Sequence, residues 1–244
     1  MSLVDHLAEL RHRLAICIIV VLIGGVIGFV LAPQIITALA APLPDAGGGT
    51  KVQFLTLSGG FLLFMKVSIV FGIILGLPVI LYELWAFVAP GLTPEERKTA
   101  LPWIPMTIIF FVMGVAVAYV TLPYAVAFLT GFNIPGVAET KPSAESYYGF
   151  VSMIFLIFGA VMEFPIALVL LHKLGIISVD KLRTSRRYVI LGIVIFSVII
   201  TPGGDPISPM VMSVTMYALF EFTIFLLIRS DRRKAEKLAK SAGA

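Results

Sequence analysis

Six runs of apolar residues, separated by shorter polar segments, dominate the chain. They lie near residues 14–32, 67–88, 101–122, 150–171, 188–201 and 209–228. Four of them reach the roughly 20 residues that an α-helix needs to cross a bilayer, and the sixth is just long enough. The fifth run, 188–201, has only 14 residues, a length that suits a tilted or re-entrant half-span. The pattern favours six transmembrane helices.

The basic residues gather in alternate segments between these runs. If the N-terminus is cytoplasmic and every run crosses the membrane, only Lys51, Lys66 and Lys141 of the 18 Lys and Arg residues fall outside. This bias follows the positive-inside rule and predicts that both termini are cytoplasmic. A re-entrant hairpin over 188–228 would leave the C-terminus inside as well, so the charges do not exclude it.

The composition excludes several classes of protein. Hydrophobic residues make up 59% of the 244 residues and charged residues 13%, about half the usual charged share of soluble proteins. Too little polar surface remains to coat a water-soluble globule, which excludes a soluble enzyme, a disordered chain and a nucleic-acid-binding protein. The single cysteine, Cys17, cannot form an intrachain disulfide.

Small residues and prolines predict how the helices pack. Glycines four residues apart let helix backbones approach closely, and we interpret these as contacts within one bundle. Prolines remove helical hydrogen bonds and kink helices, so we expect an all-α bundle with a concave face. The glycines are Gly24, Gly28, Gly72 and Gly76, and the prolines are Pro78, Pro102, Pro105 and Pro165.

The segment 33–66 is too broken by glycine to cross the membrane and too apolar to float free. We expect it to lie along the outer interface as a cap. The alternative is that it extends the second span.

Ionisable residues inside the apolar runs need an explanation, because a charge at mid-bilayer costs at least about 2.5–3.5 kcal/mol. Glu163, near the centre of the fourth run, can carry a proton, contact a polar group of a cargo or partner, or form an internal hydrogen bond. Glu221 and Glu83 are interpreted as internal hydrogen-bonding groups, or as an interfacial group in the case of Glu83. Asp205 precedes a proline at a helix start, which is typical of an N-cap.

Acidic residues also stand at the predicted cytoplasmic side. Glu9 and Arg11 lie in the amphipathic start of the first helix, and Glu95 and Glu96 lie in the short loop after the second. Carboxylates among positive charges can bind a basic ligand through paired hydrogen bonds. The alternative, a solvated loop with local ion pairs, is favoured by the residues alone.

No enzyme motif accompanies these residues. The sequence has no phosphate-binding Gly-x-x-x-x-Gly-Lys-Ser/Thr loop. His6, His12 and His172 lack the spacing and the companions of a metal site. We therefore expect neither catalysis nor a bound metal or cofactor.

Five motifs resemble, in order, those of the TatC family, the receptor subunit of the twin-arginine protein translocase. They are LVDHLAELRHRL at 3–14, LWAFVAPGLTPEER at 84–97, EFPIA at 163–167, DKLR at 180–183, and TPGGDP at 201–206 with YALFE at 217–221. Any one of them would be weak, but five in order over nearly the whole chain are specific.

The resemblance implies a function that composition cannot give. TatC proteins bind the twin-arginine signal peptides of folded precursors at the cytoplasmic face. They assemble with the single-span proteins TatA and TatB into oligomers, and transport is driven by the proton-motive force. The chain is then a multi-pass protein of the bacterial inner membrane. The alternative is a proton-coupled secondary transporter that uses Glu163, although no internal repeat supports it.

The resemblance also implies roles for single residues. Glu9 and Glu96 match the carboxylates that bind the two arginines of the signal peptide, a pairing that lysine does not reproduce. Arg11, Phe87 and Pro90 belong to the same patch.

Other matched positions lie away from this patch. Glu163 matches the intramembrane glutamate of the concave face, Pro42 the outer cap and Asp205 the short outer loop before the last helix. The chain departs from the family at one point: some members carry a glutamine three or four residues after this aspartate, as a polar contact for partner helices, and here Ser208 and Pro209 stand in its place. The docking candidates are Ser208, Pro209 and Glu221. The family's last two helices are short, which agrees with the short fifth run.

Overall fold

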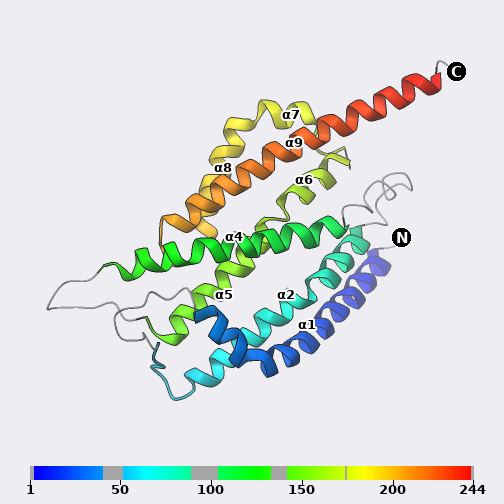
Figure 1. Ribbon diagram of the computed structural model, residues 1–244. Helices are drawn as coiled ribbons and strands as arrows, with labels where there is room; N and C mark the ends of the chain where they lie inside the picture. The colour runs from blue at the N-terminus through cyan, green and yellow to red at the C-terminus, as the bar shows by residue number, and fades with distance from the viewer. Residues whose placement is uncertain (1–2, 41–51, 89–103, 133–141, 174, 243–244) are drawn as a thin grey trace.

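The computed structural model describes residues 3–40, 52–88, 104–132, 142–173 and 175–242, and helices account for nearly all of these residues. Figure 1 shows them in chain order. They are α1 (Leu3–Ala40), α2 (Gly59–Val88), α4 (Ile104–Thr130), α5 (Ala144–Val161), α6 (Phe164–Lys173), α7 (Val179–Thr184), α8 (Arg186–Ile200) and α9 (Ile207–Ala242).

Five helical stretches within the described residues are long and apolar enough to cross a membrane. They are His6–Ala40, Gly59–Phe87, Pro105–Thr130, Ala144–His172 and Ile207–Arg232. Helix α8 has 15 residues, or about 22 Å at 1.5 Å per residue, which is less than the hydrocarbon thickness of a bilayer. The all-α membrane fold is confirmed, whereas a full sixth span stays a prediction.

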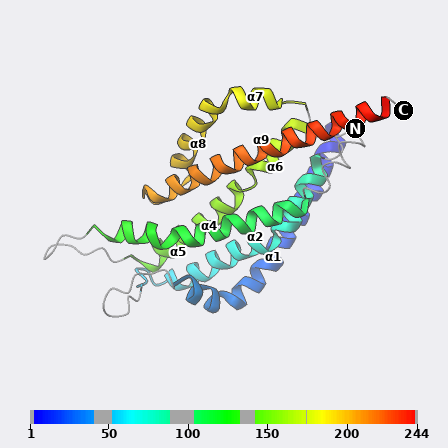
Figure 2. The same ribbon diagram turned by 45° about the horizontal axis from the view of Figure 1, so that its top comes forward.

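The helices form a bundle with two distinct edges. In both views α1 and α2 lie at one edge and α7 and α8 at the other, with α4, α5, α6 and α9 between them (Figures 1 and 2). The start of α1 and the end of α9 lie at the same end of the bundle. Which side of the membrane this end faces stays a prediction.

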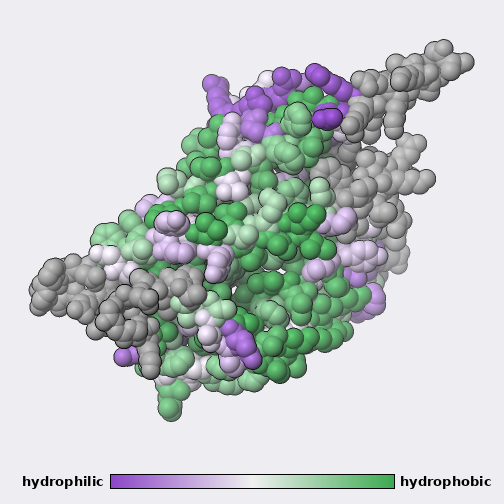
Figure 3. Space-filling model, in the orientation of Figure 1, coloured by the Kyte–Doolittle hydropathy of each residue, from purple (hydrophilic) through white to green (hydrophobic). Residues whose placement is uncertain are grey.

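The surface has the polarity of a protein surrounded by lipid. Hydrophobic residues cover the middle of the face in Figure 3, and hydrophilic residues gather at its margins, with the largest group over α7. On α1, side chains such as Leu22, Val26 and Val30 are more than half exposed. Such a band would be unstable in water, and it fits the apolar core of a bilayer.

Glycines bring α1 and α2 into close contact. A Cβ atom on Gly72 would lie 2.6 Å from the backbone nitrogen of Gly25 and from the carbonyl oxygen of Val21. A Cβ on Gly24 would lie 2.9 Å from the Cα atom of Gly72. The predicted glycine contact is therefore confirmed, and it joins helices of the same chain.

The proline expected to kink the fourth span separates two helices instead. Helix α5 ends at Val161 and α6 begins at Phe164. Pro165 has no amide hydrogen to donate to the carbonyl oxygen of Val161, so the regular hydrogen-bond pattern stops there. Glu163 lies in the break, where its amide bonds to the carbonyl oxygen of Ala160 at 3.1 Å.

Helices extend into both ends of the segment 33–66, whereas the cap expected there stays a prediction. Residues 33–40 continue α1, and residues 59–66 begin α2, as in the alternative interpretation. Two tyrosines of α5 explain why α1 continues so far. The hydroxyl groups of Tyr147 and Tyr148 donate to the carbonyl oxygens of Leu39 and Ile36 at 2.7 and 3.1 Å, so the last turn has partners for its free acceptors.

The last helix continues beyond its apolar run. Helix α9 runs past the expected end at 228 and reaches Ala242. Its final turns are rich in lysine and arginine, which favour helices in water but end the apolar pattern. The third span is also displaced, since α4 ends at Thr130 and not near 122.

Candidate functional site

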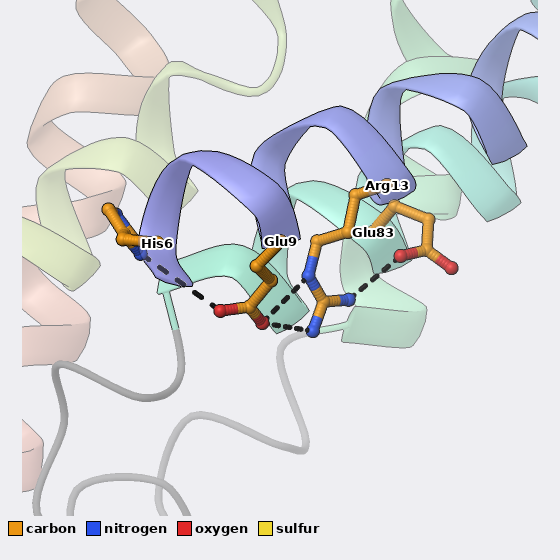
Figure 4. Close-up of polar contacts among 4 residues, drawn as sticks. All are labelled: His6, Glu9, Arg13 and Glu83. Carbon is orange, nitrogen blue, oxygen red and sulfur yellow. Dashed lines mark hydrogen bonds and ion pairs between the residues drawn. The ribbon is translucent and has the colours of Figure 1, made fainter. Parts of the chain in front are cut away.

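An ionic cluster joins the first turns of α1 to the last turns of α2. Because the two helices run antiparallel, the start of one lies beside the end of the other (Figure 1). Glu9 and Arg13 are four residues apart and therefore share one face of α1. Glu83 faces them from α2, and Figure 4 shows all three side chains converging.

Arg13 binds both carboxylates of this cluster. Its Nη2 and Nε atoms donate to the same oxygen, Oε1 of Glu9, at 2.7 and 3.1 Å. Its Nη1 atom donates to Oε2 of Glu83 at 2.8 Å. The side chains of Arg13, Glu9 and Glu83 are 23%, 19% and 11% exposed, so the contacts are only partly screened by water.

The two carboxylate oxygens of Glu9 differ in their contacts. Oε2 is buried and has no hydrogen-bond partner among the described residues. Nδ1 of His6 lies 4.0 Å from Oε2, beyond hydrogen-bond distance. The imidazole of His6 stacks on the ring of Phe87 with 4.4 Å between centroids. The site thus offers a carboxylate oxygen beside an aromatic surface, which suits a guanidinium group.

A second feature lies at the opposite edge of the bundle. A hollow of about 840 Å³ opens between α5, α6, α8 and α9, and Glu163 is the one charged residue among its otherwise apolar lining. Both carboxylate oxygens of Glu163 are buried and have no hydrogen-bond partner among the described residues. This hollow gives the bundle the expected concave region. An unpaired carboxylate there can bind a proton or a polar group.

Comparison with known proteins decides the family. The family model for the Sec-independent protein translocase protein (TatC) matches residues 5–214. The chain belongs to the TatC family.

The chain matches individual TatC proteins and a TatC crystal structure over most of their lengths. The chain is 36% identical over 222 residues to TatC of Desulforapulum autotrophicum, which covers 90% of this chain and 82% of the relative. It is 36% identical over 225 residues to TatC of Escherichia coli K12, which covers 91% and 86%. A crystal structure of the twin arginine translocase receptor TatC in DDM superposes with a TM-score of 0.77 at 33% identity, covering 91% of this chain and 98% of that one.

Membership in the TatC family assigns the chain its general role. It is a component of a protein translocase and not an enzyme, and it acts with the other components of the Tat system. Its apolar helices and its relatives make it a multi-pass protein of the bacterial inner membrane.

The structure brings together some of the predicted receptor residues of this TatC chain. Glu9 belongs to the ionic cluster, Phe87 stacks on His6, which lies 4.0 Å from Glu9, and Arg11 is exposed on α1. Pro90, Glu96 and Pro42 lie outside the described residues, so their positions stay predictions.

The sequence interpretation missed Arg13 and the connection to Glu83. The spacing of Glu9 and Arg13 was the available signal for the first, because residues four apart on a helix are neighbours. For the second, the signal was the charge of Glu83 inside an apolar helix, which requires a partner.

The partner-docking candidates of the sequence analysis are mostly engaged within the chain. The carboxylate of Asp205 accepts a 2.7 Å hydrogen bond from the amide of Ser208, as expected for an N-cap, and Ser208 is fully buried. Glu221 accepts hydrogen bonds from Arg186 at 2.7 Å and from the hydroxyl of Tyr217 at 3.1 Å. Pro209 is partly exposed.

Proposed function

We propose that this chain is the receptor and core subunit of a twin-arginine translocase. It binds the twin-arginine signal peptides of folded precursor proteins, and the cluster around Glu9 forms part of the binding site. The observation that carries the proposal is the buried Oε2 atom of Glu9, which has no hydrogen-bond partner among the described residues. A similar solved structure is itself described as a twin arginine translocase receptor.

The chemistry of the site explains a preference for arginine. A guanidinium group is planar and donates parallel hydrogen bonds to a carboxylate, whereas an ammonium group is a compact point charge. A guanidinium group also stacks favourably on aromatic rings. Glu9 and Phe87 supply these two kinds of contact, and Glu96 and Pro90 complete the patch together with Arg11.

The same proposal includes the orientation of the chain in the membrane and its partner proteins. The end of the bundle that carries both chain termini faces the cytoplasm, in agreement with its excess of Lys and Arg. TatA- and TatB-type single-span proteins assemble with the chain into hetero-oligomers, and the proton-motive force drives export. Their docking surface includes Pro209 near the start of α9, with Ser208 and Glu221 contributing after a local rearrangement.

Photo-crosslinking tests the receptor role. A photoreactive phenylalanine analogue at position 87 is combined with a signal peptide carrying Arg-Arg or Lys-Lys, in membranes that contain the full chain and its partner subunits. We expect strong labelling by the Arg-Arg peptide that falls with Lys-Lys and with Glu9→Gln or Glu96→Ala. Asp180→Asn is the matched control, because this exposed carboxylate of α7 lies outside the proposed patch.

Two outcomes would contradict the receptor role. Equal labelling by the two peptides would show that the site does not distinguish arginine from lysine. No labelling in the presence of partner subunits would show that no peptide reaches Phe87.

A second candidate function rests on Glu163. Because its carboxylate has no hydrogen-bond partner among the described residues and faces the hollow, the chain is also a candidate proton-coupled transporter. Proton uptake by liposomes that contain the chain alone, lost in Glu163→Gln, would support this function. Proton uptake equal to that of empty liposomes would exclude the transporter function.

A further inference from the structure

Arg13 is held between carboxylates from two different helices. Glu9 comes from α1 and Glu83 from α2, 70 positions further along the chain. Glu83 is 9% exposed and lies within the apolar stretch Gly59–Phe87. The sequence analysis gave it no part in ligand binding, and the proposed function does not use it.

The charges in this cluster do not balance. With two carboxylates and one guanidinium in their ionised forms, the cluster has one excess negative charge. His6, 4.0 Å from Glu9, adds a positive charge only when it is protonated. Without Glu83, Arg13 would neutralise Glu9, and the attraction of the site for a positively charged ligand would decrease.

The geometry of Arg13 has a second consequence. A guanidinium group facing a lone carboxylate usually donates to both of its oxygens. Here the bond from Nη1 to Glu83 turns the group, so that Nε and Nη2 both donate to Oε1 of Glu9. Oε2 of Glu9 consequently remains without a partner among the described residues.

We propose that Glu83 is a positioning residue that determines the preference of this site for a guanidinium ligand. By binding Arg13, it keeps one oxygen of Glu9 free and supplies the excess negative charge that an arginine of the signal peptide neutralises. The inference rests on the proposed receptor function and assigns a role within that site.

A purely mechanical role for Glu83 is the competing explanation. Its ion pair could simply join α1 to α2. However, these helices already touch along their glycines, where a Cβ on Gly72 would lie 2.6 Å from backbone atoms of α1. The pair is therefore not needed to bring the two helices together, and its position beside Glu9 is better explained by ligand binding.

A charge-restoring pair of variants separates the two explanations. Glu83→Gln leaves a neutral Glu9–Arg13 pair, whereas Arg13→Gln combined with Glu83→Gln restores one excess negative charge on a Glu9 that Arg13 no longer covers. We expect the affinity for an Arg-Arg signal peptide, measured with the full chain in nanodiscs, to fall about tenfold in Glu83→Gln. The double variant should return to within about threefold of the unmodified chain, because electrostatic complementarity is restored.

Two controls accompany these variants. Glu83→Asp keeps the charge on a shorter side chain and should retain more affinity than Glu83→Gln. Thermal unfolding of each variant shows whether it is folded, so that a loss of binding is not mistaken for a loss of structure. The affinity for the Lys-Lys peptide is measured in parallel. The ratio of the Arg-Arg affinity to the Lys-Lys affinity should be smaller in Glu83→Gln than in the unmodified chain.

The possible failures are distinguishable. If the unmodified chain binds Arg-Arg and Lys-Lys peptides equally, the receptor function and this inference both fail. If it prefers Arg-Arg and Glu9→Gln removes that preference, but Glu83→Gln does not change binding, only the inference fails. A double variant that binds no better than Glu83→Gln would also overturn the inference, since a mechanical tie is not restored by removing its second half.

Discussion

The two edges of the bundle differ in how they accommodate a buried carboxylate. At the α1–α2 edge, Glu83 is bound by Arg13 at 2.8 Å, and Arg13 also binds Glu9. Towards the opposite edge, Glu163 lies in the break between α5 and α6 and lines a hollow of about 840 Å³ that extends to α8, with no hydrogen-bond partner among the described residues. At the first edge an arginine of the chain binds the buried carboxylate, and at Glu163 no hydrogen-bond partner stands among the described residues.

The two edges also differ in how closely their helices pack. The α1–α2 contact is so close that a side chain on Gly72 would meet the backbone of α1. At Gly192 of α8, a Cβ would meet nothing within 4 Å. Because lipid gives helices no hydrophobic reason to associate, close packing supplies much of the stability. The α1–α2 pair is therefore closely packed beneath the proposed receptor site, and the α8 edge has room for another molecule.

The largest effect is expected from Gly72→Ala. The added methyl group would lie 2.6 Å from two backbone atoms of α1, so the helices must separate. We expect a loss of about 2–3 kcal/mol in stability, as for other overpacked contacts. Thermal unfolding in detergent, with and without the signal peptide, measures this loss of stability. The affinity for the peptide should also fall, because Glu9 and Glu83 move apart. An unchanged unfolding temperature would show that the contact is looser than the structure indicates.

A smaller effect of opposite sign is expected from Glu163→Leu. The substitution removes a buried carboxylate that has no hydrogen-bond partner among the described residues and fills part of an apolar hollow. Burying an unsatisfied polar group costs about 1–3 kcal/mol, so the variant should unfold at a higher temperature. Glu83→Leu is the matched comparison and should unfold at a lower temperature, because Arg13 loses a partner. If both variants shift in the same direction, the contrast between the edges is wrong.

Much of the helical fold could be predicted from the sequence. The apolar runs identified most of the membrane helices, and the spacing of Gly24 and Gly28 and of Gly72 and Gly76 predicted close packing within the bundle, because both depend on local periodicity. Which helices touch was not predicted. The break before Pro165 could not be predicted, since a proline either bends or interrupts a helix according to its surroundings. The full length of α9 was missed because hydropathy detects only the apolar part of a helix that continues in charged residues.

The candidate site was only partly predictable. The family resemblance identified Glu9 and Phe87, and the four-residue spacing of Glu9 and Arg13 was an available signal that the sequence interpretation did not use. The contact with Glu83 depends on how far α1 and α2 slide along each other, and no single helix contains that information. The tyrosine bonds from α5 to the end of α1 are hidden for the same reason, since they join residues more than 100 positions apart.

The smallest effect should come from Gly192→Ala, the counterpart of Gly72→Ala at the loosely packed edge. The methyl group enters open space, and alanine loses less backbone freedom than glycine when a helix forms. We expect a gain of about 0.5–1 kcal/mol, seen as a slightly higher unfolding temperature. The sign of the stability change distinguishes the two edges, because the same substitution at Gly72 is expected to destabilise the chain. If Gly192→Ala instead lowers stability, something must already contact this face of α8 in the assembled protein, and unfolding with and without the partner subunits would identify it.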